Sequence, residues 1–406
     1  MEDPENDAAA RRAWILSFVA YATYYLGRKG FGVAKKTIER DLGIGRDGLA
    51  VIDTGHLALY AIGQFANGVL ADRVGARRLV GFGMLASAAA CAWFGASSSA
   101  LVLFVAFALN GYAQSTGWPG TTRAMAEWTT SANRRRVMAI WATCYQFGGI
   151  FASAGAAWLL RFGWRSVFFV PAVFLTIVGS VVLVAMPTAP SATYVHEHDV
   201  EERRARRQAM RDALLSPTLW SFGASYFAIK LIRYSLLFWL PYYLSDELGY
   251  APSAAGYLST AFEVGAIFGV VGTGLFTHRV RRVSRPALSA GMLVALGAII
   301  FLYTKIAPLG AAANALGLGL VGVSLFGPDS LLAGAVAQDA GGPRAAATAT
   351  GLVNGVGSLG AILQGALNAW VSRVFGWHAV FYSFVTFSMI AALALVPTFA
   401  RDDRAP

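Results

Sequence analysis

The stretch Trp158–Phe168 reads WLLRFGWRSVF, and the stretch Trp370–Phe381 repeats much of it as WVSRVFGWHAVF. One residue is inserted in the second stretch, and both end with the pattern Gly-Trp-x-x-Val-Phe. Each stretch joins two apolar segments of the chain. An internal repeat of this kind indicates that the fold is built from two similar halves.

A second pair of segments follows the same repeat. Tyr21 and Arg28 lie seven residues apart in the first apolar segment, and Tyr226 and Arg233 lie seven apart in the seventh. A Leu-Gly pair follows each arginine at nearly the same distance. We therefore expect two parallel repeats related by an axis along the membrane normal, with a binding site between the halves that is exposed to each side in turn.

The composition is that of a membrane protein. Of the 406 residues, 56% are hydrophobic and 14% are charged, and the mean hydropathy is +0.53, whereas a soluble domain carries about 25% charged residues. Helices satisfy their own backbone hydrogen bonds in lipid and need roughly 20 residues to cross it. The sequence predicts an all-α membrane protein with twelve transmembrane helices in two six-helix bundles. The predicted spans are Ala13–Val33, Leu49–Leu70, Leu79–Gly95, Leu101–Ala126, Val137–Leu160, Val167–Met186, Leu219–Leu244, Ala254–Phe276, Ala287–Tyr303, Leu309–Val336, Ala345–Val371 and Val380–Phe399.

Polar segments divide the chain into domains. We expect an N-terminal tail at 1–12, a first bundle at 13–186, a charged linker at 187–216, a second bundle at 217–400 and a C-terminal tail at 401–406. The linker carries a run of charges typical of a solvated segment or a surface helix. Because the N-terminal tail is polar and acidic, the first apolar segment is expected to be a permanent span rather than a signal peptide.

The basic residues are distributed unevenly between the two sides of the membrane. With both termini on one side, twenty of the 33 Lys and Arg residues lie in segments on that side, five lie within spans, and eight lie opposite. Cytoplasmic segments are the ones enriched in Lys and Arg, so we expect both termini in the cytoplasm, in a cell inner membrane. The net charge of +11 is thus explained by topology and predicts no nucleic-acid partner. The eight basic residues expected on the side opposite the termini are Lys35, Lys36, Arg40, Arg46, Arg161, Arg165, Lys305 and Arg373.

The sequence predicts neither an enzyme nor a metalloprotein. Cys91 and Cys144 both lie in apolar runs, which does not suggest a disulfide or metal site. The chain contains no Walker A loop, no HExxH and no dinucleotide-binding glycine pattern. We expect no cofactor, and a monomer whose partners are the lipid bilayer and a small anionic substrate.

Arg28 and Arg233 are the strongest candidates for substrate binding. A charge within the bilayer costs at least ~2.5–3.5 kcal/mol on insertion scales, so an intramembrane arginine is a functional candidate. The repeat places both at one depth, facing one central cavity, where two guanidiniums would bind a phosphate or carboxylate. The alternative is that each arginine is neutralised by a local acid and ties helices together, although no acid lies one turn away on either helix.

Other polar residues in the spans extend this site. Lys230 lies one turn before Arg233 on the same face, as Tyr25 does before Arg28, although Lys230 could instead extend towards the membrane interface. Asp329 could balance charge or cap a helix broken at Pro328. The remaining candidates are Asp53, His56, Tyr60 and Gln64 on one face of span two, Tyr145 and Gln146 in span five, and Lys29 and Glu263, which with Asp329 could balance one another's charge.

Several motifs resemble those of a known family. The segment Gly68–Arg78 (GVLADRVGARR) resembles the loop signature of the major facilitator superfamily, carried by Gly68, Asp72, Arg73, Gly75 and Arg77. In the second half this loop has His278 where Asp would stand. The motifs Tyr24–Lys29, Gly117–Pro119 with Arg123 and Trp128, and Ile232–Tyr234 are similar to those of the organophosphate:phosphate antiporters, which include glycerol-3-phosphate and hexose-6-phosphate transporters.

The resemblance implies exchange of a sugar phosphate or glycerol phosphate for inorganic phosphate, bound between Arg28 and Arg233. It also implies a cavity lined by Tyr21, Tyr25, Tyr60 and Trp118. Three positions depart from the family pattern: Gln64 replaces a Lys, Tyr145 replaces a His, and Phe238 replaces an Asp.

Two alternatives to phosphate exchange stay open at this point. The first is a proton-coupled symporter of a carboxylate or another organic anion, with Glu263, Asp329 or His56 as the proton site. The second is a transporter-like membrane sensor that binds a sugar phosphate without measurable flux.

Overall fold

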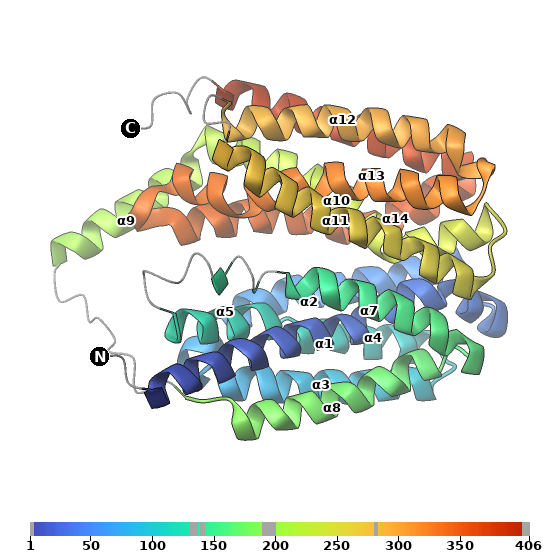
Figure 1. The fold of residues 1–406 in the computed structure, drawn as a ribbon, viewed down its shortest axis with the longest axis horizontal. Helices are drawn as coiled ribbons and strands as arrows, with labels where there is room; N and C mark the ends of the chain where they lie inside the picture. Colours follow the sequence, from blue (N-terminus) through green and yellow to red (C-terminus); the bar gives the residue numbers. More distant parts are fainter. Residues whose placement is uncertain are drawn as a thin grey trace. The chain divides into compact units, whose positions relative to one another are not determined.

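The computed structural model describes residues 4–129, 137–138, 141, 143–188, 200–279 and 283–399. These residues are almost entirely helical (Figure 1), which confirms the predicted all-α class. The predicted C-terminal tail 401–406 and residues 189–199 of the predicted linker lie outside the described residues.

The chain divides into two compact units. The first comprises residues 1–193 with 240–260, and the second comprises 194–239 with 261–406. The helices of the N-terminal part are α1 (Pro4–Leu42), α2 (Arg46–Val74), α3 (Ala76–Ala96), α4 (Ala100–Gln114), α5 (Gly117–Glu127), α7 (Cys144–Leu159), the short η1 (Leu160–Phe162) and α8 (Ser166–Ala185). Those that follow are α9 (Val200–Leu215), α10 (Pro217–Asp246), α11 (Pro252–Arg279), α12 (Arg285–Ile306), η2 (Ala307–Leu309), α13 (Ala311–Ser330), the π-helical turn η3 (Leu331–Ala335), α14 (Val336–Leu395) and η4 (Val396–Thr398).

Two helices are shared between the units. Helix α10 contributes residues 217–239 to the second unit and its last turns to the first, and Pro241 lies inside it at this division. Helix α11 begins in the first unit and continues into the second from Ala261.

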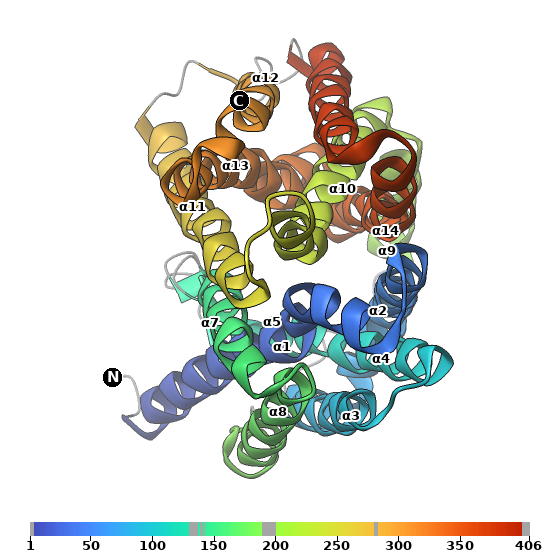
Figure 2. The ribbon, with the colours of Figure 1, turned by 90° about the vertical axis from the view of Figure 1, so that its right-hand side faces the viewer.

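In the first unit, helices far apart in sequence pack in pairs. Helix α3 packs against α8, α2 against α4, and α1 against α7, as the end-on view in Figure 2 shows. One core cluster of this unit is built around Tyr24, Met84 and Leu175, each fully buried.

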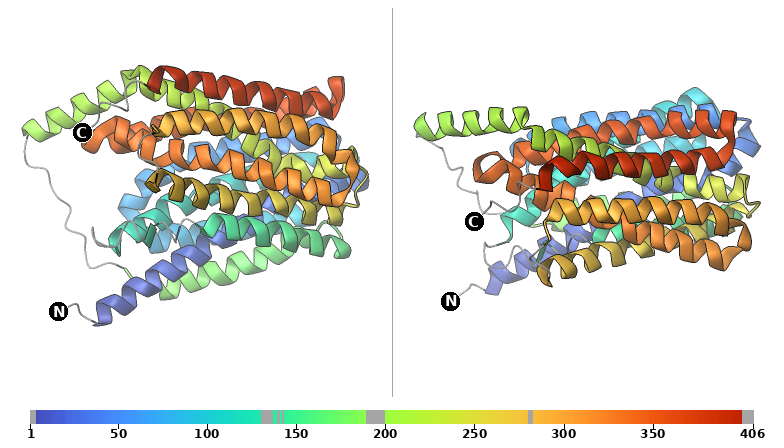
Figure 3. Two further views of the ribbon diagram at one scale, coloured as in Figure 1. Left: turned by 45° about the horizontal axis from the view of Figure 1, so that its top comes forward. Right: turned by 90° about the horizontal axis from the view of Figure 1, so that it is seen from above.

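In the second unit, α12 packs against both α13 and α14, and the orange helices α12 and α13 run side by side in Figure 3. The charged helix α9 packs against α14. The part of the predicted linker that the structure describes is therefore a surface helix, one of the two forms expected from its charge run.

The sequence repeat recurs in the backbone. Gly163 and Gly376, which precede the two repeated tryptophans, have φ values of +90° and +81°. Gly43 and Gly249 of the repeated Leu-Gly pairs have φ values of +66° and +71°. Glycine adopts this left-handed region at no steric cost, so each Gly ends one helix at an equivalent point of its half.

Eight helical segments within the described ranges are long and apolar enough to cross a membrane. One of them, Thr348–Thr398, has 51 residues and includes the bend at Gly376, so it covers two predicted spans. Helices α1, α7 and α10 correspond to predicted spans one, five and seven but are not among the eight. Helix α7 has 16 residues, and α1 and α10 carry several charged side chains.

Candidate functional site

Arg28 is buried in the middle of α1 with a defined orientation. Its side chain is 3% exposed, and its Nε donates a hydrogen bond of 2.9 Å to Oε1 of Gln114 on α4. The guanidinium carbon lies 4.6 Å from the ring centre of Tyr60 on α2 and 5.1 Å from that of Tyr25 on α1. These contacts orient a guanidinium, a group whose planar fork suits the binding of an anion.

A polar network behind Gln114 supports this orientation. Gln114 Nε2 lies 3.3 Å from Asn110 Oδ1 and 3.4 Å from Ser87 Oγ, and Ser87 donates a 2.6 Å bond to the same Asn110 oxygen. Asn110 Nδ2 in turn donates to the Gly27 carbonyl at 2.8 Å. The network links α3 and α4 to α1 next to Arg28. Our sequence reasoning missed it, although Asn110 and Gln114 are polar residues four apart in an apolar span.

Aromatic side chains gather one to two turns from Arg28. The Tyr21 ring lies 6.0 Å from Tyr25 and 5.5 Å from Trp118, and Trp118 lies 5.8 Å from Trp141. Trp118 is 39% exposed, and Tyr145 packs against the same cluster. The structure therefore brings together the aromatic residues that the resemblance implied and adds Trp141. Their role in lining a cavity stays a prediction.

The predicted polar face of α2 is divided among different partners. Tyr60 contacts the Arg28 guanidinium, and Gln64 is half-buried further along the helix. The His56 ring stacks on Phe107 at 4.3 Å, and its Nδ1 lies 3.0 Å from the Phe107 carbonyl oxygen. Gly111 makes this close packing possible, because a Cβ there would lie 2.1 Å from the His56 carbonyl oxygen.

Asp53 forms an ion pair with Lys35 of α1, and both side chains are fully buried. Lys35 follows Val33, the residue at which the first span was expected to end. Helix α1 continues to Leu42, and Lys35 stays inside the unit because Asp53 neutralises its charge.

In the second unit, Arg233 forms an ion pair with Asp329. Arg233 Nη1 lies 3.1 Å from Oδ1 and 2.9 Å from Oδ2 of Asp329, and the two side chains are 15% and 5% exposed. The guanidinium carbon also lies 4.7 Å from the ring centre of Phe326. The neutralising acid comes from α13, which is why a search one turn away on α10 did not reveal it.

The expectation that Asp329 could cap a helix broken at Pro328 is wrong. Helix α13 continues through Pro328 to Ser330 and is followed by the π-helical turn η3. Turns of this kind are rare and occur often at functional sites. Asp329 thus presents its carboxylate to Arg233 from within a continuous helix.

Lys230 lies on α10 one turn before Arg233, and its Nζ lies 3.3 Å from both the Asn354 carbonyl oxygen and Ser358 Oγ of α14. Its ammonium group therefore points to α14 rather than extending to a membrane interface. A Cβ at Gly357 would lie 3.0 Å from Lys230 Cδ, so the glycine leaves room for this side chain.

Lys29 and Glu263 are both buried, at 5% and 3% exposed, on α1 and α11. Lys29 belongs to the first unit, and Glu263 and Asp329 belong to the second. Asp329 pairs with Arg233, and the charge balance among Lys29, Glu263 and Asp329 stays a prediction.

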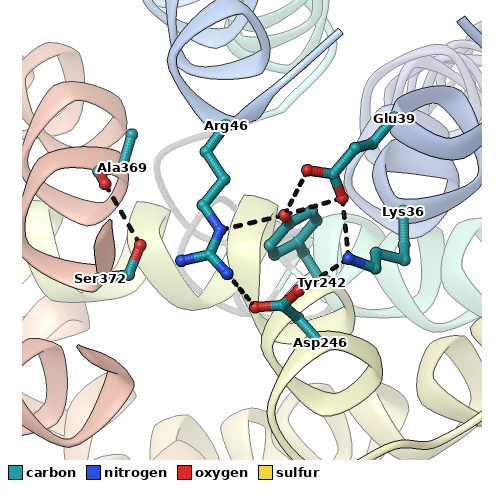
Figure 4. Close-up of polar contacts among 7 residues, drawn as sticks. All are labelled: Lys36, Glu39, Arg46, Tyr242, Asp246, Ala369 and Ser372. Atoms are coloured by element: carbon teal, nitrogen blue, oxygen red, sulfur yellow. Dashed lines mark hydrogen bonds and ion pairs between the residues drawn. The ribbon is translucent and has the colours of Figure 1, made fainter. Parts of the chain in front are cut away.

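Five side chains at the end of the first unit form a network that the sequence did not predict, here named the Asp246 cluster (Figure 4). Lys36 Nζ lies 2.7 Å from Asp246 Oδ1 and 2.8 Å from Glu39 Oε2, and Arg46 pairs with the other Asp246 oxygen. The Tyr242 hydroxyl donates to Glu39 at 2.9 Å and accepts from Arg46 Nε at 3.2 Å. The cluster joins the last turns of α10 to α1 and α2.

The predicted loop motif lies between α2 and α3. Gly75 has a φ of +80° and links the two helices, and Arg77 Nε donates to the Leu183 carbonyl of α8 at 2.5 Å. Gly68 lies inside α2 and Arg73 is exposed at its end, while the Asp72 side chain lies outside the described part. The motif thus joins three helices on the side where α2 ends.

Comparisons with known proteins agree with this architecture. The family model described as Major Facilitator Superfamily matches residues 17–365. Sugar phosphate exchanger 3 of Gallus gallus is 29% identical over 402 residues, covering 88% of this chain and 80% of that protein. A candidate glycerol-3-phosphate transporter of Arabidopsis thaliana is 29% identical over 435 residues, covering 94% of this chain and 85% of that protein.

A solved structure gives the same fold. The bacterial homologue of the human lysosomal transporter Spinster, inward-facing and occupied, aligns with a TM-score of 0.76 at 15% identity and covers 100% of both chains. The all-helical architecture of the described residues is thus that of this transporter fold. From the family match over most of the chain, the protein belongs to the Major Facilitator Superfamily and is a membrane transporter, not an enzyme.

Proposed function

We propose that this transporter exchanges a phosphate monoester, a sugar phosphate or glycerol 3-phosphate, for inorganic phosphate. The observation that carries the proposal is the buried guanidinium of Arg28, oriented by Gln114 between the rings of Tyr25 and Tyr60. A planar guanidinium fixed in this way matches the geometry of a phosphate group. The printed names of the relatives support the same substrate class.

Arg233 is proposed as the second anion ligand, with Asp329 as its partner in the empty state. The Asp329 carboxylate contacts Arg233 as a phosphate oxygen would. An incoming anion therefore competes with Asp329, and departure of the anion returns Arg233 to it. We propose that the two halves interconvert readily only when a bound anion balances the charges of Arg28 and Lys230, which makes exchange obligatory.

The charge of the ligand decides how many cations it needs. A phosphate monoester carries between one and two negative charges near neutral pH, since its second pKa is about 6. Gln64 and Tyr145 replace residues that would add positive charge, and Lys230 supplies a cation one turn from Arg233. We propose that Lys230 favours the dianionic ester.

We propose the domain organisation and topology from the sequence. The proposed organisation is a tail at 1–12, a bundle at 13–186, a linker at 187–216, a bundle at 217–400 and a tail at 401–406. Both termini are proposed to be cytoplasmic, because the segments on that side carry more Lys and Arg. The proposed setting is a cell inner membrane, with the protein acting as a monomer by alternating access.

The second candidate is proton-coupled transport of an organic anion. One observation favours it: Glu263 is 3% exposed within the membrane-spanning part of α11. A buried carboxyl group in a membrane helix is a typical proton carrier.

Uptake into proteoliposomes separates these candidates. Vesicles preloaded with inorganic phosphate and vesicles preloaded with buffer are given labelled glycerol 3-phosphate, glucose 6-phosphate or a carboxylate. Exchange predicts uptake of a phosphate ester that requires internal phosphate. Accumulation in buffer-filled vesicles only under a pH gradient, lost in Glu263→Gln, would support the symporter instead.

A further inference from the structure

A long apolar groove lies in the first unit, away from Arg28. Helices α2 and α3 both pack on α4 but touch each other little, and the groove runs between them with α4 as its floor. Its volume is about 790 Å³. Leu70 of α2 and Tyr112 of α4 line it and are exposed.

The shape of the groove comes from residue size along α3. Ala86 and Ala89 line it and are exposed, while the larger side chains Phe82 and Trp93 are 61% and 46% exposed on the same helix. Exposed apolar side chains on a membrane-spanning helix face lipid chains. The groove is thus a trough in which an acyl chain makes more contacts than on a flat helix surface.

One end of the groove is positively charged. Arg78, the third residue of α3, lines the groove and is exposed, and among the described lining residues it alone carries a charge. Arg73 is exposed on the other side of the same turn, whereas Arg77 donates to the Leu183 carbonyl. A guanidinium at the end of an apolar trough complements a phosphate attached to an acyl chain.

We propose that this groove binds an anionic phospholipid, with one acyl chain along α3 and the phosphate at Arg78. The described lining offers an arginine and no acid, so it attracts a net negative headgroup more than a zwitterionic one. The α2–α3 turn lies on the predicted cytoplasmic side, where anionic lipids are enriched. The bound lipid would stabilise the turn that carries the loop motif.

Photo-crosslinking in vesicles tests this site independently of transport. The purified transporter is placed in phosphatidylcholine vesicles that contain a trace of either phosphatidylglycerol or phosphatidylcholine with a diazirine on one acyl chain. Labelled residues are then mapped by mass spectrometry. The proposal expects labelling near Ala86 and Ala89, about fivefold stronger with the phosphatidylglycerol probe.

Three variants separate the contribution of the Arg78 charge to lipid labelling from that of the apolar trough. Arg78→Gln is expected to remove the preference for phosphatidylglycerol, and Ala89→Trp to reduce labelling by both probes because it fills the trough. Arg161→Gln is the control, because Arg161 is an exposed arginine beside Trp158 and is not among the described residues that line the groove. Equal labelling by both probes in the unmodified protein, or a preference that survives Arg78→Gln, would show unselective surrounding lipid and overturn the proposal.

Discussion

Arg233 Nη1 lies 2.9 Å from one carboxylate oxygen of Asp329 and 3.1 Å from the other, so a single guanidinium nitrogen contacts both. The pair joins α10 to α13 and is largely buried. In a transporter that binds anions, such a carboxylate competes with the ligand. The pair is therefore the point at which ligand binding can alter contacts between helices.

Asp329→Asn is expected to strengthen the binding of inorganic phosphate about tenfold, because Arg233 no longer has an anionic competitor. Exchange should become slower, since the anion leaves a more positive site less readily. Calorimetric titration with phosphate and exchange rates measure the two effects. Asp339→Asn is the control, because Asp339 forms an exposed pair with Arg285. Unchanged or weaker phosphate binding in Asp329→Asn contradicts the competition.

Gln114→Ala is expected to weaken phosphate binding about tenfold, because Arg28 loses the hydrogen bond that orients its guanidinium. The same change in an Arg28→Lys background should have little effect, since lysine has no Nε–H to orient. Titration of both backgrounds with phosphate measures the difference. An equal loss in the two backgrounds would mean that Gln114 acts through the general fold.

Asp246→Asn is expected to loosen the end of α10, because it removes the negative charge that pairs with both Lys36 and Arg46 and one of the two acceptor oxygens. A cysteine at half-buried Ser245 reports the change, and the native Cys91 and Cys144 are buried. A membrane-impermeant thiol reagent should label Ser245→Cys several-fold faster in the Asp246→Asn background. Glu247→Gln, at the neighbouring exposed acid, should leave the rate unchanged. Equal rates in all three proteins would show that the ion pairs of Asp246 do not hold the end of α10 in place.

The Lys35–Asp53 pair is expected to act as a structural link between α1 and α2. Removing one partner of a buried pair leaves an uncompensated charge, so Asp53→Asn should lower the free energy of unfolding by about 3–5 kcal/mol. The double change Lys35→Met with Asp53→Leu should recover most of that loss, because no charge is left buried. Denaturant unfolding measures stability, and exchange measures function. A stable double variant without exchange would instead assign the pair to transport.

The sequence predicted the fold well because the period of its apolar segments and its internal repeat are properties of the chain itself. Gly163 and Gly376, equivalent in sequence, have equivalent left-handed conformations. Lys35 shows the limit of this reasoning: a hydropathy profile ended the helix before a lysine that a neighbouring helix neutralises.

The candidate site was predictable only in part. Arg28 and Arg233 stood out as charges in apolar segments, but their partners Gln114 and Asp329 lie 86 and 96 residues away in sequence. Helical spacing shows which residues share one face of a helix, not which side chain the neighbouring helix presents. The Asp246 cluster was missed for the same reason, since about 200 residues separate Arg46 from Asp246.

The central claim is that Arg28 and Arg233 bind one and the same anion. A double-mutant cycle tests it through the phosphate affinity of the unmodified protein, Arg28→Lys, Arg233→Lys and the double variant, with lysine keeping the charge but losing the planar fork. Residues that share one ligand are coupled, so the account predicts that the double variant binds phosphate only slightly more weakly than the weaker single variant. Losses that simply add, within the ~0.3–0.5 kcal/mol expected of independent sites, would contradict a shared anion.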